Sequence, residues 1–270
     1  MGHTRLGQMP KTRKWRQVVA AVLEGYTDDP DTEAVLLSED VGRIAREAAA
    51  AAEVGLRRAA DDSGLQYAVY LLTQLVLAAR ESSPEERLAA AGLDLREGGG
   101  ALDLTLTFQR ALDSYVERSG RHTDTGEMAQ QAACEALCAL VAPRLRTLFG
   151  ADRQEVLAAL RDLSTKKGFG ELGQRFFGSF LLRYLSFFLS RATPSALGTA
   201  RIPQLGDLNR FNEALRTHCL QTALIVRDFC GGWLTKTEWE VGIDSGATNR
   251  FVAVALKKLR AELKHQGQEG

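Results

Sequence analysis

The residues that could do chemistry are few, and the first group is a run of glycines. Gly168, Gly170 and Gly173 form a G-x-G-x-x-G pattern that follows Lys166 and Lys167. Glycines at a helix N-terminus let backbone N–H groups approach a phosphate. The dinucleotide-binding version needs a buried strand before the glycines, whereas the preceding segment RDLSTKK is polar and follows a predicted helix. We therefore interpret the glycines as a flexible helix start with close packing, and phosphate binding is the alternative.

The four cysteines and four histidines form the second group. Cys134 and Cys138 lie one helical turn apart, so they share a helix face and could supply two zinc ligands. His218 and Cys219 are adjacent and point about 100° apart on a helix, so they cannot chelate one ion together. Cys219 and Cys230 are about three turns apart, which is too far to share an ion. We expect buried free thiols and predict no metal site.

Local patterns of hydrolytic enzymes are absent from the sequence. It contains no G-x-S-x-G nucleophile elbow and no helical H-E-x-x-H motif. The four histidines are scattered, so general acid–base chemistry at neutral pH has no evident place. A site assembled from distant residues leaves no local pattern, but nothing in the sequence favours an enzyme, and we predict no cofactor.

The elements that would position these residues are organised around the segment Phe169–Leu189, which holds seven aromatic residues. Five residues fall at helical spacing along one side of this segment, and the last four are aromatic: Gly173, Phe177, Phe180, Tyr184 and Phe187. The most apolar stretch, 176–189, includes Arg183 and is shorter than the roughly twenty apolar residues that a bilayer-spanning helix needs. We expect other helices to enclose this helix. Its release into a membrane on a signal is the alternative.

The fold class follows from composition and periodicity. The 270 residues are 45% hydrophobic and 25% charged, which is typical of a globular protein. Helical periodicity recurs with little sign of strands, so we predict an all-α fold of about ten or eleven helices, a multi-helix bundle or small α-solenoid around the aromatic-rich helix. The glycines 98–100 predict a joint between an N-terminal helical subdomain, 12–97, and a C-terminal one, 101–265, and one continuous domain is the alternative. Residues 1–11 are predicted to be a flexible basic arm.

Capping signals predict the boundaries of the last helices. Asp207 is expected to cap a helix that runs to Phe229 and that Gly231 and Gly232 terminate. The following segment WLTKTEWEVGIDSGATN is expected to be looped or short-helical. An amphipathic helix is then predicted from Arg250 to about Lys264.

The formal net charge of +0 hides an uneven distribution. Residues 1–16 carry five Lys or Arg and no acid, residues 17–100 carry seven bases and sixteen acids, and residues 151–270 carry seventeen bases and twelve acids. Such asymmetry can steer a partner of opposite charge. The predicted partner contacts lie at the two basic ends: Arg5, Lys11, Arg13, Lys14, Trp15, Arg16, Arg250, Lys257, Arg260 and Lys264.

These observations favour a non-catalytic helical interaction protein, an adaptor or complex subunit that contacts another protein through its basic ends. Nucleic-acid binding is the first alternative, because the bases near Trp15 could contact phosphate while the indole stacks on a base. A membrane-active effector that releases the aromatic helix 176–189 is the second. The N-terminal segment has no secretory apolar stretch and the cysteines form no disulfide framework, so we predict a cytoplasmic location. A homo-oligomer is compatible with this charge pattern.

Overall fold

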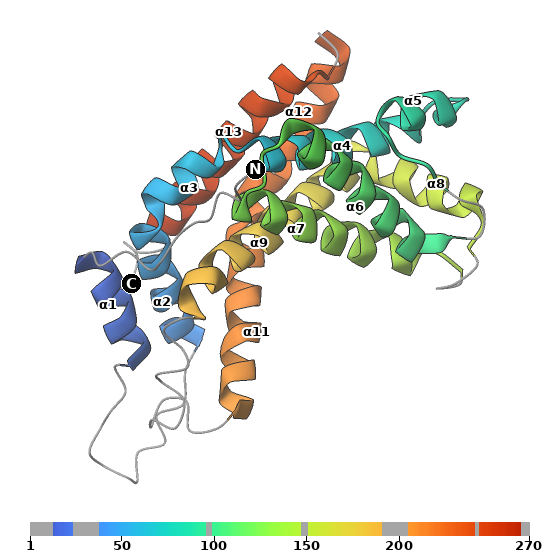
Figure 1. The fold of residues 1–270 in the computed structure, drawn as a ribbon. Coiled ribbons are helices and arrows are strands. Elements are labelled where there is room, and N and C mark those ends of the chain that lie inside the picture. Colours follow the sequence, from blue (N-terminus) through green and yellow to red (C-terminus); the bar gives the residue numbers. More distant parts are fainter. Residues whose placement is uncertain are drawn as a thin grey trace.

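The computed structural model describes residues 13–23, 38–95, 99–146, 151–190, 205–240 and 243–265. These ranges form twelve α-helices and one short 3-10 helix and contain no strand, which confirms the predicted all-α multi-helix bundle (Figure 1). The first six helices are α1 (Arg13–Leu23), α2 (Ser38–Ala51), α3 (Glu53–Ala59), α4 (Ser63–Ala78), α5 (Pro84–Ala90) and α6 (Gly100–Ser119). The others are α7 (Asp124–Val141), η1 (Ala142–Arg144), α8 (Arg153–Leu163), α9 (Lys166–Leu189), α11 (Leu205–Thr222), α12 (Leu224–Glu240) and α13 (Ser245–His265).

The aromatic-rich helix α9 is enclosed by its neighbours. It packs against α7, α11 and α12 and also touches α2 and α8 (Figure 1). Phe187 is half-buried, and the other six of its seven aromatic rings are at most 5% exposed: Phe169, Phe176, Phe177, Phe180, Tyr184 and Phe188. A helix that is apolar around most of its circumference requires such an enclosure. No helix in the described ranges is long and apolar enough to cross a bilayer.

Helices on both sides of the predicted glycine joint contribute to the same core. The N-terminal helix α4 packs against α7 and α13, and α2 packs against α11 and α13. Leu65 and Leu72 of α4 belong to the same buried cluster as Phe177 of α9 and Leu256 of α13. The division into two subdomains remains a prediction.

Three predicted boundaries near the C-terminus are wrong. Helix α11 begins at Leu205, so Asp207 lies within its first turn, and the chain breaks at Ala223 to begin α12. Helix α12 continues through Gly231 and Gly232 to Glu240, because packing against α9 outweighs the low helix propensity of glycine. Helix α13 begins at Ser245. The preceding residue, Asp244, caps it, since its carboxylate accepts a hydrogen bond from the backbone N–H of residue 247 at 2.6 Å.

Candidate interaction surface

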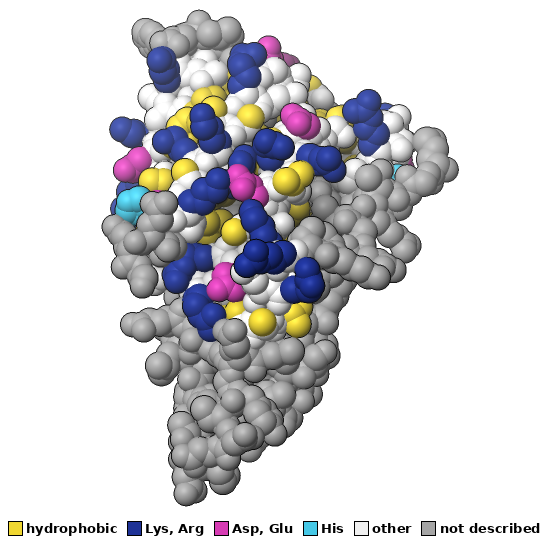
Figure 2. Space-filling model, turned by 90° about the vertical axis from the view of Figure 1, so that its left-hand side faces the viewer, with side chains coloured by type: hydrophobic (Ala, Val, Ile, Leu, Met, Phe, Trp, Pro, Cys, Tyr) yellow, Lys and Arg dark blue, Asp and Glu magenta, His cyan; other side chains and the backbone are white. Residues whose placement is uncertain are grey.

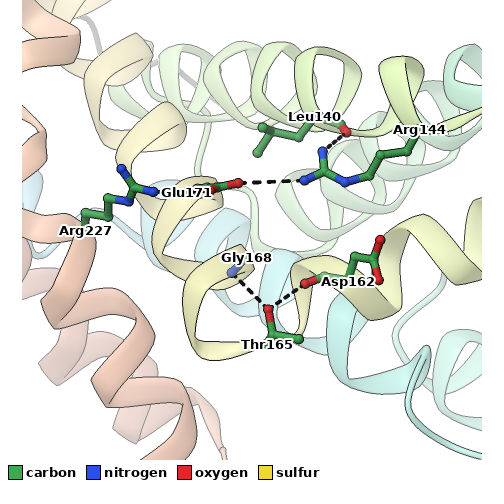
Figure 3. Close-up of polar contacts among 7 residues, drawn as sticks. All are labelled: Leu140, Arg144, Asp162, Thr165, Gly168, Glu171 and Arg227. Carbon is green, nitrogen blue, oxygen red and sulfur yellow. Dashed lines mark hydrogen bonds and ion pairs between the residues drawn. The ribbon is translucent and has the colours of Figure 1, made fainter.

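The glycine pattern at the start of α9 is used for packing. Thr165 caps this helix, and its hydroxyl accepts a hydrogen bond from the Gly168 N–H at 3.0 Å while donating one to the Asp162 carbonyl at 2.8 Å (Figure 3). A Cβ on Gly168 would overlap that carbonyl, and one on Gly170 would lie 2.8 Å from the carbonyl oxygen of Arg227 on α12. The neighbouring helices α8 and α12 therefore lie directly against these two glycines.

The same close approach continues along α9 and α12. A Cβ on Gly173 would overlap the sulfur of Cys230, and a Cβ on Gly231 would overlap the carbonyl oxygen of Lys166. Glycines therefore allow the two backbones to approach from both sides of the contact. This supports the close-packing interpretation of the G-x-G-x-x-G pattern.

Two half-buried carboxylates tie α9 to the surrounding helices and are occupied by arginines. Glu171 of α9 lies between Arg227 of α12, at 3.1 Å, and Arg144 of η1, at 3.7 Å (Figure 3). In the same way, Glu135 of α7 pairs with Arg183 of α9 at 2.6 Å. Each carboxylate is held between two arginines.

The pKa of Glu135 agrees with a role in holding α7 and α9 together through ion pairs. Burial alone would raise the pKa of the Glu135 carboxyl, but hydrogen bonds from Arg183, Ser179 and Arg216 outweigh burial and lower that pKa. The group is therefore a charged acceptor at neutral pH. General acid catalysis at pH 7 requires the opposite shift.

The cysteines differ in exposure. Cys138 is exposed, whereas Cys134 is half-buried and its thiol lies 3.7 Å from the Thr105 carbonyl oxygen. Burial raises the pKa of Cys134 to about 11, and it also raises the pKa values of the buried Cys219 and Cys230. These three thiols are poor nucleophiles at neutral pH. Within the described ranges, no group of three His, Cys, Asp or Glu side chains could hold a metal ion.

Helix α13 turns a basic side outward. Its buried side, which includes Phe251 and Leu259, packs into the core, while Arg250, Lys257 and Lys264 are exposed. The helix contains five Lys or Arg and a single acid, Glu262. The exposed side of α13 therefore carries an excess of positive charge.

Arg260 has a different role from the other predicted α13 contacts. It is half-buried and donates a hydrogen bond to Glu53 of α3 at 3.0 Å, and Lys264 donates to the same carboxylate at 2.8 Å. These hydrogen bonds, from Lys264 first and then from Arg260, lower the pKa of Glu53 to about 2. Glu53 is therefore charged at neutral pH and fixes the end of α13 against α3.

The two basic ends, which are far apart in the sequence, meet at the junction of α2 and α3. The ammonium of Lys14 on α1 donates to the carbonyl of Ala50 at 3.4 Å, and Lys264 binds Glu53 three residues further along. We name the exposed bases of α1, α3 and α13 the basic surface, which begins at this junction and extends along α13. It comprises Arg13, Lys14 and Arg16 of α1, Arg57 and Arg58 of α3, and Arg250, Lys257 and Lys264 of α13. Figure 2 shows the side of the molecule on which these helices lie, with many Lys and Arg and few Asp and Glu side chains.

One predicted contact residue lies in the core instead. Trp15 is 2% exposed, and its ring centroid is 4.7 Å from that of Phe188 on α9. The indole anchors α1 to the core, so it cannot stack on a nucleic-acid base without leaving the core. The predicted contacts Arg5 and Lys11 lie outside the described residues.

Sequence reasoning missed the contribution of α3. Arg57 and Arg58 are part of an alanine-rich segment whose pattern indicates a single helix, and the break at Ala52 that separates α2 from α3 has no Gly or Pro signal. Only the contact between Glu53 and α13, more than 200 residues later, places these bases beside the C-terminal helix.

Comparison of the chain with protein-family models, curated proteins and solved structures found no match.

Proposed function

We propose that this protein is a non-catalytic interaction protein, an adaptor or complex subunit, that binds an acidic protein partner through the basic surface. The observation that carries this proposal is the convergence of α1, α3 and α13. These helices come from distant parts of the sequence, α1 and α13 both contact the junction of α2 and α3, and few acids appear on the side of the molecule where they lie. A surface of one sign attracts and orients a partner of the other sign.

A protein partner is favoured over nucleic acid by the apolar side chains among the bases. Val54 of α3 is 53% exposed and Val254 of α13 is 41% exposed. Protein interfaces combine an apolar centre with a polar rim, whereas contacts to a phosphate backbone use mainly cationic and hydrogen-bonding groups. The burial of Trp15 also removes a residue that could have stacked on a base.

Charge reversal on the full-length protein tests this proposal. The variant Arg57→Glu/Lys257→Glu changes two exposed bases of the basic surface, and Arg110→Glu/Arg118→Glu makes the same change on exposed positions of α6. Quantitative cross-linking in cells of origin should recover an acidic protein with the wild type and with the α6 variant. The basic-surface variant should recover about tenfold less of it. Equal recovery with both variants would contradict the proposal.

A salt titration with mixed DNA and RNA separates the nucleic-acid alternative. Phosphate contacts weaken steeply as salt concentration rises, with a slope that counts the neutralised phosphates. We expect no binding to either nucleic acid at about 0.15 M salt. Tight, steeply salt-dependent binding that the Arg57→Glu/Lys257→Glu variant loses would replace the proposed protein partner by nucleic acid.

A further inference from the structure

We infer that the partner segment seated on the basic surface is an acidic amphipathic α-helix that lies along the exposed side of α13. This inference rests on the proposed function and specifies the partner's chemistry. The residues that carry it form one exposed line on α13: Arg250, Val254, Lys257, Ala261 and Lys264. They are separated by four, three, four and three residues, and this is the heptad spacing along which two helices pack side by side.

The side chains of this line suit a helical partner. The three bases recur every seven residues, which is about 10.5 Å along the helix, and they alternate with the short apolar side chains of Val254 and Ala261. The short side chains let a second helix approach, while the apolar stems of the bases can lie along its surface with their charged ends reaching acids or water. An extended strand repeats its outward side chains about every 6.8 Å and does not keep this register.

Charge complementarity identifies the partner helix as acidic. The line contains three bases and no acid, and Glu262 lies off it. Among the described residues, Arg250 and Lys257 have no ion-pair partner. A partner with Glu at heptad intervals would supply these missing counter-charges, whereas a basic helix would be repelled.

The line is also held rigid before a partner arrives. The opposite side of α13 is buried through Phe251, Val252 and Leu256, and Glu53 holds its last turns through Arg260 and Lys264. Because α13 is already ordered, docking requires little further ordering of this protein. Only the partner segment would have to fold or orient.

Two synthetic peptides of about three heptads test the inference against the full-length protein. The first carries Leu and Glu at the two heptad positions that would face α13, and the second has the same composition in scrambled order. Fluorescence anisotropy at about 0.15 M salt should show that the heptad peptide binds about tenfold more tightly. Circular dichroism should show that its helicity increases on binding.

Neighbouring exposed positions on α13 provide a matched control. Val254→Asp adds an acid within the line, and Ala253→Asp adds the same acid one position away from it. Val254→Asp should lower the affinity for the heptad peptide about tenfold, and Ala253→Asp should lower it by less than about threefold. Thermal unfolding of both variants identifies any loss of binding that reflects unfolding. Lys257→Glu, which changes an exposed base, provides a second test of the line.

The outcomes distinguish this inference from the proposed function. If both peptides bound with equal affinity, and Lys257→Glu lowered both affinities equally, helix docking would be overturned. The basic surface would then attract acidic peptides without regard to their heptad pattern. Binding of neither peptide would also overturn it, while cross-linking of an acidic protein would still support the proposed function. Preference for phosphatidylserine vesicles over the heptad peptide would replace the acidic helix by an anionic lipid surface.

Discussion

At the scale of single residues, identical side chains have different surroundings, and the glycines of α12 illustrate this. Gly231 faces the carbonyl oxygen of Lys166 across the contact with α9, whereas a Cβ on Gly232 would have no heavy atom within 4 Å. A sequence pattern cannot distinguish the two, because the contact that gives Gly231 its role is made by a residue 65 positions earlier.

We expect opposite effects of alanine at these two positions. Gly231→Ala should lower the free energy of unfolding by about 1–3 kcal/mol, because the added methyl group forces α9 and α12 apart. Gly232→Ala should raise it by roughly 0.5–1 kcal/mol, since alanine has the higher helix propensity and the methyl group meets open space. Urea unfolding of both variants measures the difference. Similar losses of stability for both variants would show that α12 tolerates no added methyl group at either position, whether or not the position contacts α9.

Tyr184 provides a residue-scale prediction with a pH dependence. Its side chain is buried, its hydroxyl has no hydrogen-bond partner in the described part of the chain, and burial raises its pKa from 10.0 to about 12. A raised pKa of an acid means that the folded state favours the neutral form. Its contribution to stability is therefore complete below pH 10 and is lost as the pH rises towards 12.

Tyr184→Phe removes this dependence. At pH 7 the variant should be as stable as the wild type or more stable by up to about 1 kcal/mol, because an unpaired buried hydroxyl is removed. Near pH 12 its advantage should grow by about 2–3 kcal/mol. Denaturant unfolding of both proteins at the two pH values tests this. A large loss of stability at pH 7 would show that the hydroxyl has a bonding partner.

At the scale of helices, strong hydrophobic periodicity makes the presence of a helix predictable from the sequence. Tertiary contacts determine where that helix begins and ends. The aromatic segment of α9 is predictable because its phenylalanines repeat at helical spacing over five turns, and Asp62 and Asp152 cap α4 and α8 where their types suggest. The continuation of α12 and the early start of α13 depend on packing and on the Asp244 cap, and the pattern analysis missed both.

The clamp between α3 and α13 gives a prediction at this scale. Hydrogen bonds from Lys264 and Arg260 lower the folded-state pKa of Glu53 from 4.5 to about 2. A lowered pKa means that stabilisation is present above pH 4.5 and is lost as the pH falls towards 2. Glu53→Gln should cost about 1 kcal/mol at pH 7, a value limited by partial solvent exposure, and almost nothing near pH 2.

Unfolding curves at both pH values measure this change. Glu117→Gln, on an exposed position of α6, is the control and should have little effect at either pH. A cost of Glu53→Gln that does not vary with pH would mean that packing of the side chain, and not its charge, fixes α13.

At the scale of the whole molecule, the hydrophobic cluster joins helices from both halves of the chain. Contacts of α4 with α7 and of α2 with α11 cross the glycine joint. Composition and periodicity predict the all-α class, but they do not predict which distant helices meet. The candidate surface shows the same limit: its terminal bases are predictable, whereas the participation of Arg57 and the burial of Trp15 depend on contacts across the fold.

This shared core predicts a single cooperative unfolding transition. Because helices from both halves contribute to one buried cluster, far-ultraviolet circular dichroism and tryptophan fluorescence should give coincident curves. Calorimetric and van't Hoff enthalpies should agree. Two separated transitions would instead support the division into subdomains at residues 12–97 and 101–265.

Because the cysteines differ in exposure, a dye can be attached at a single site of the unmodified protein. In the folded protein, a maleimide dye at neutral pH should modify about one thiol, that of Cys138, because the other thiols are shielded and protonated. In denaturant all four should react. A fluorophore on Cys138 would sit on α7, which packs on α4, α6 and α9. It could report partner binding through the slower rotation of the whole molecule, without any engineered cysteine.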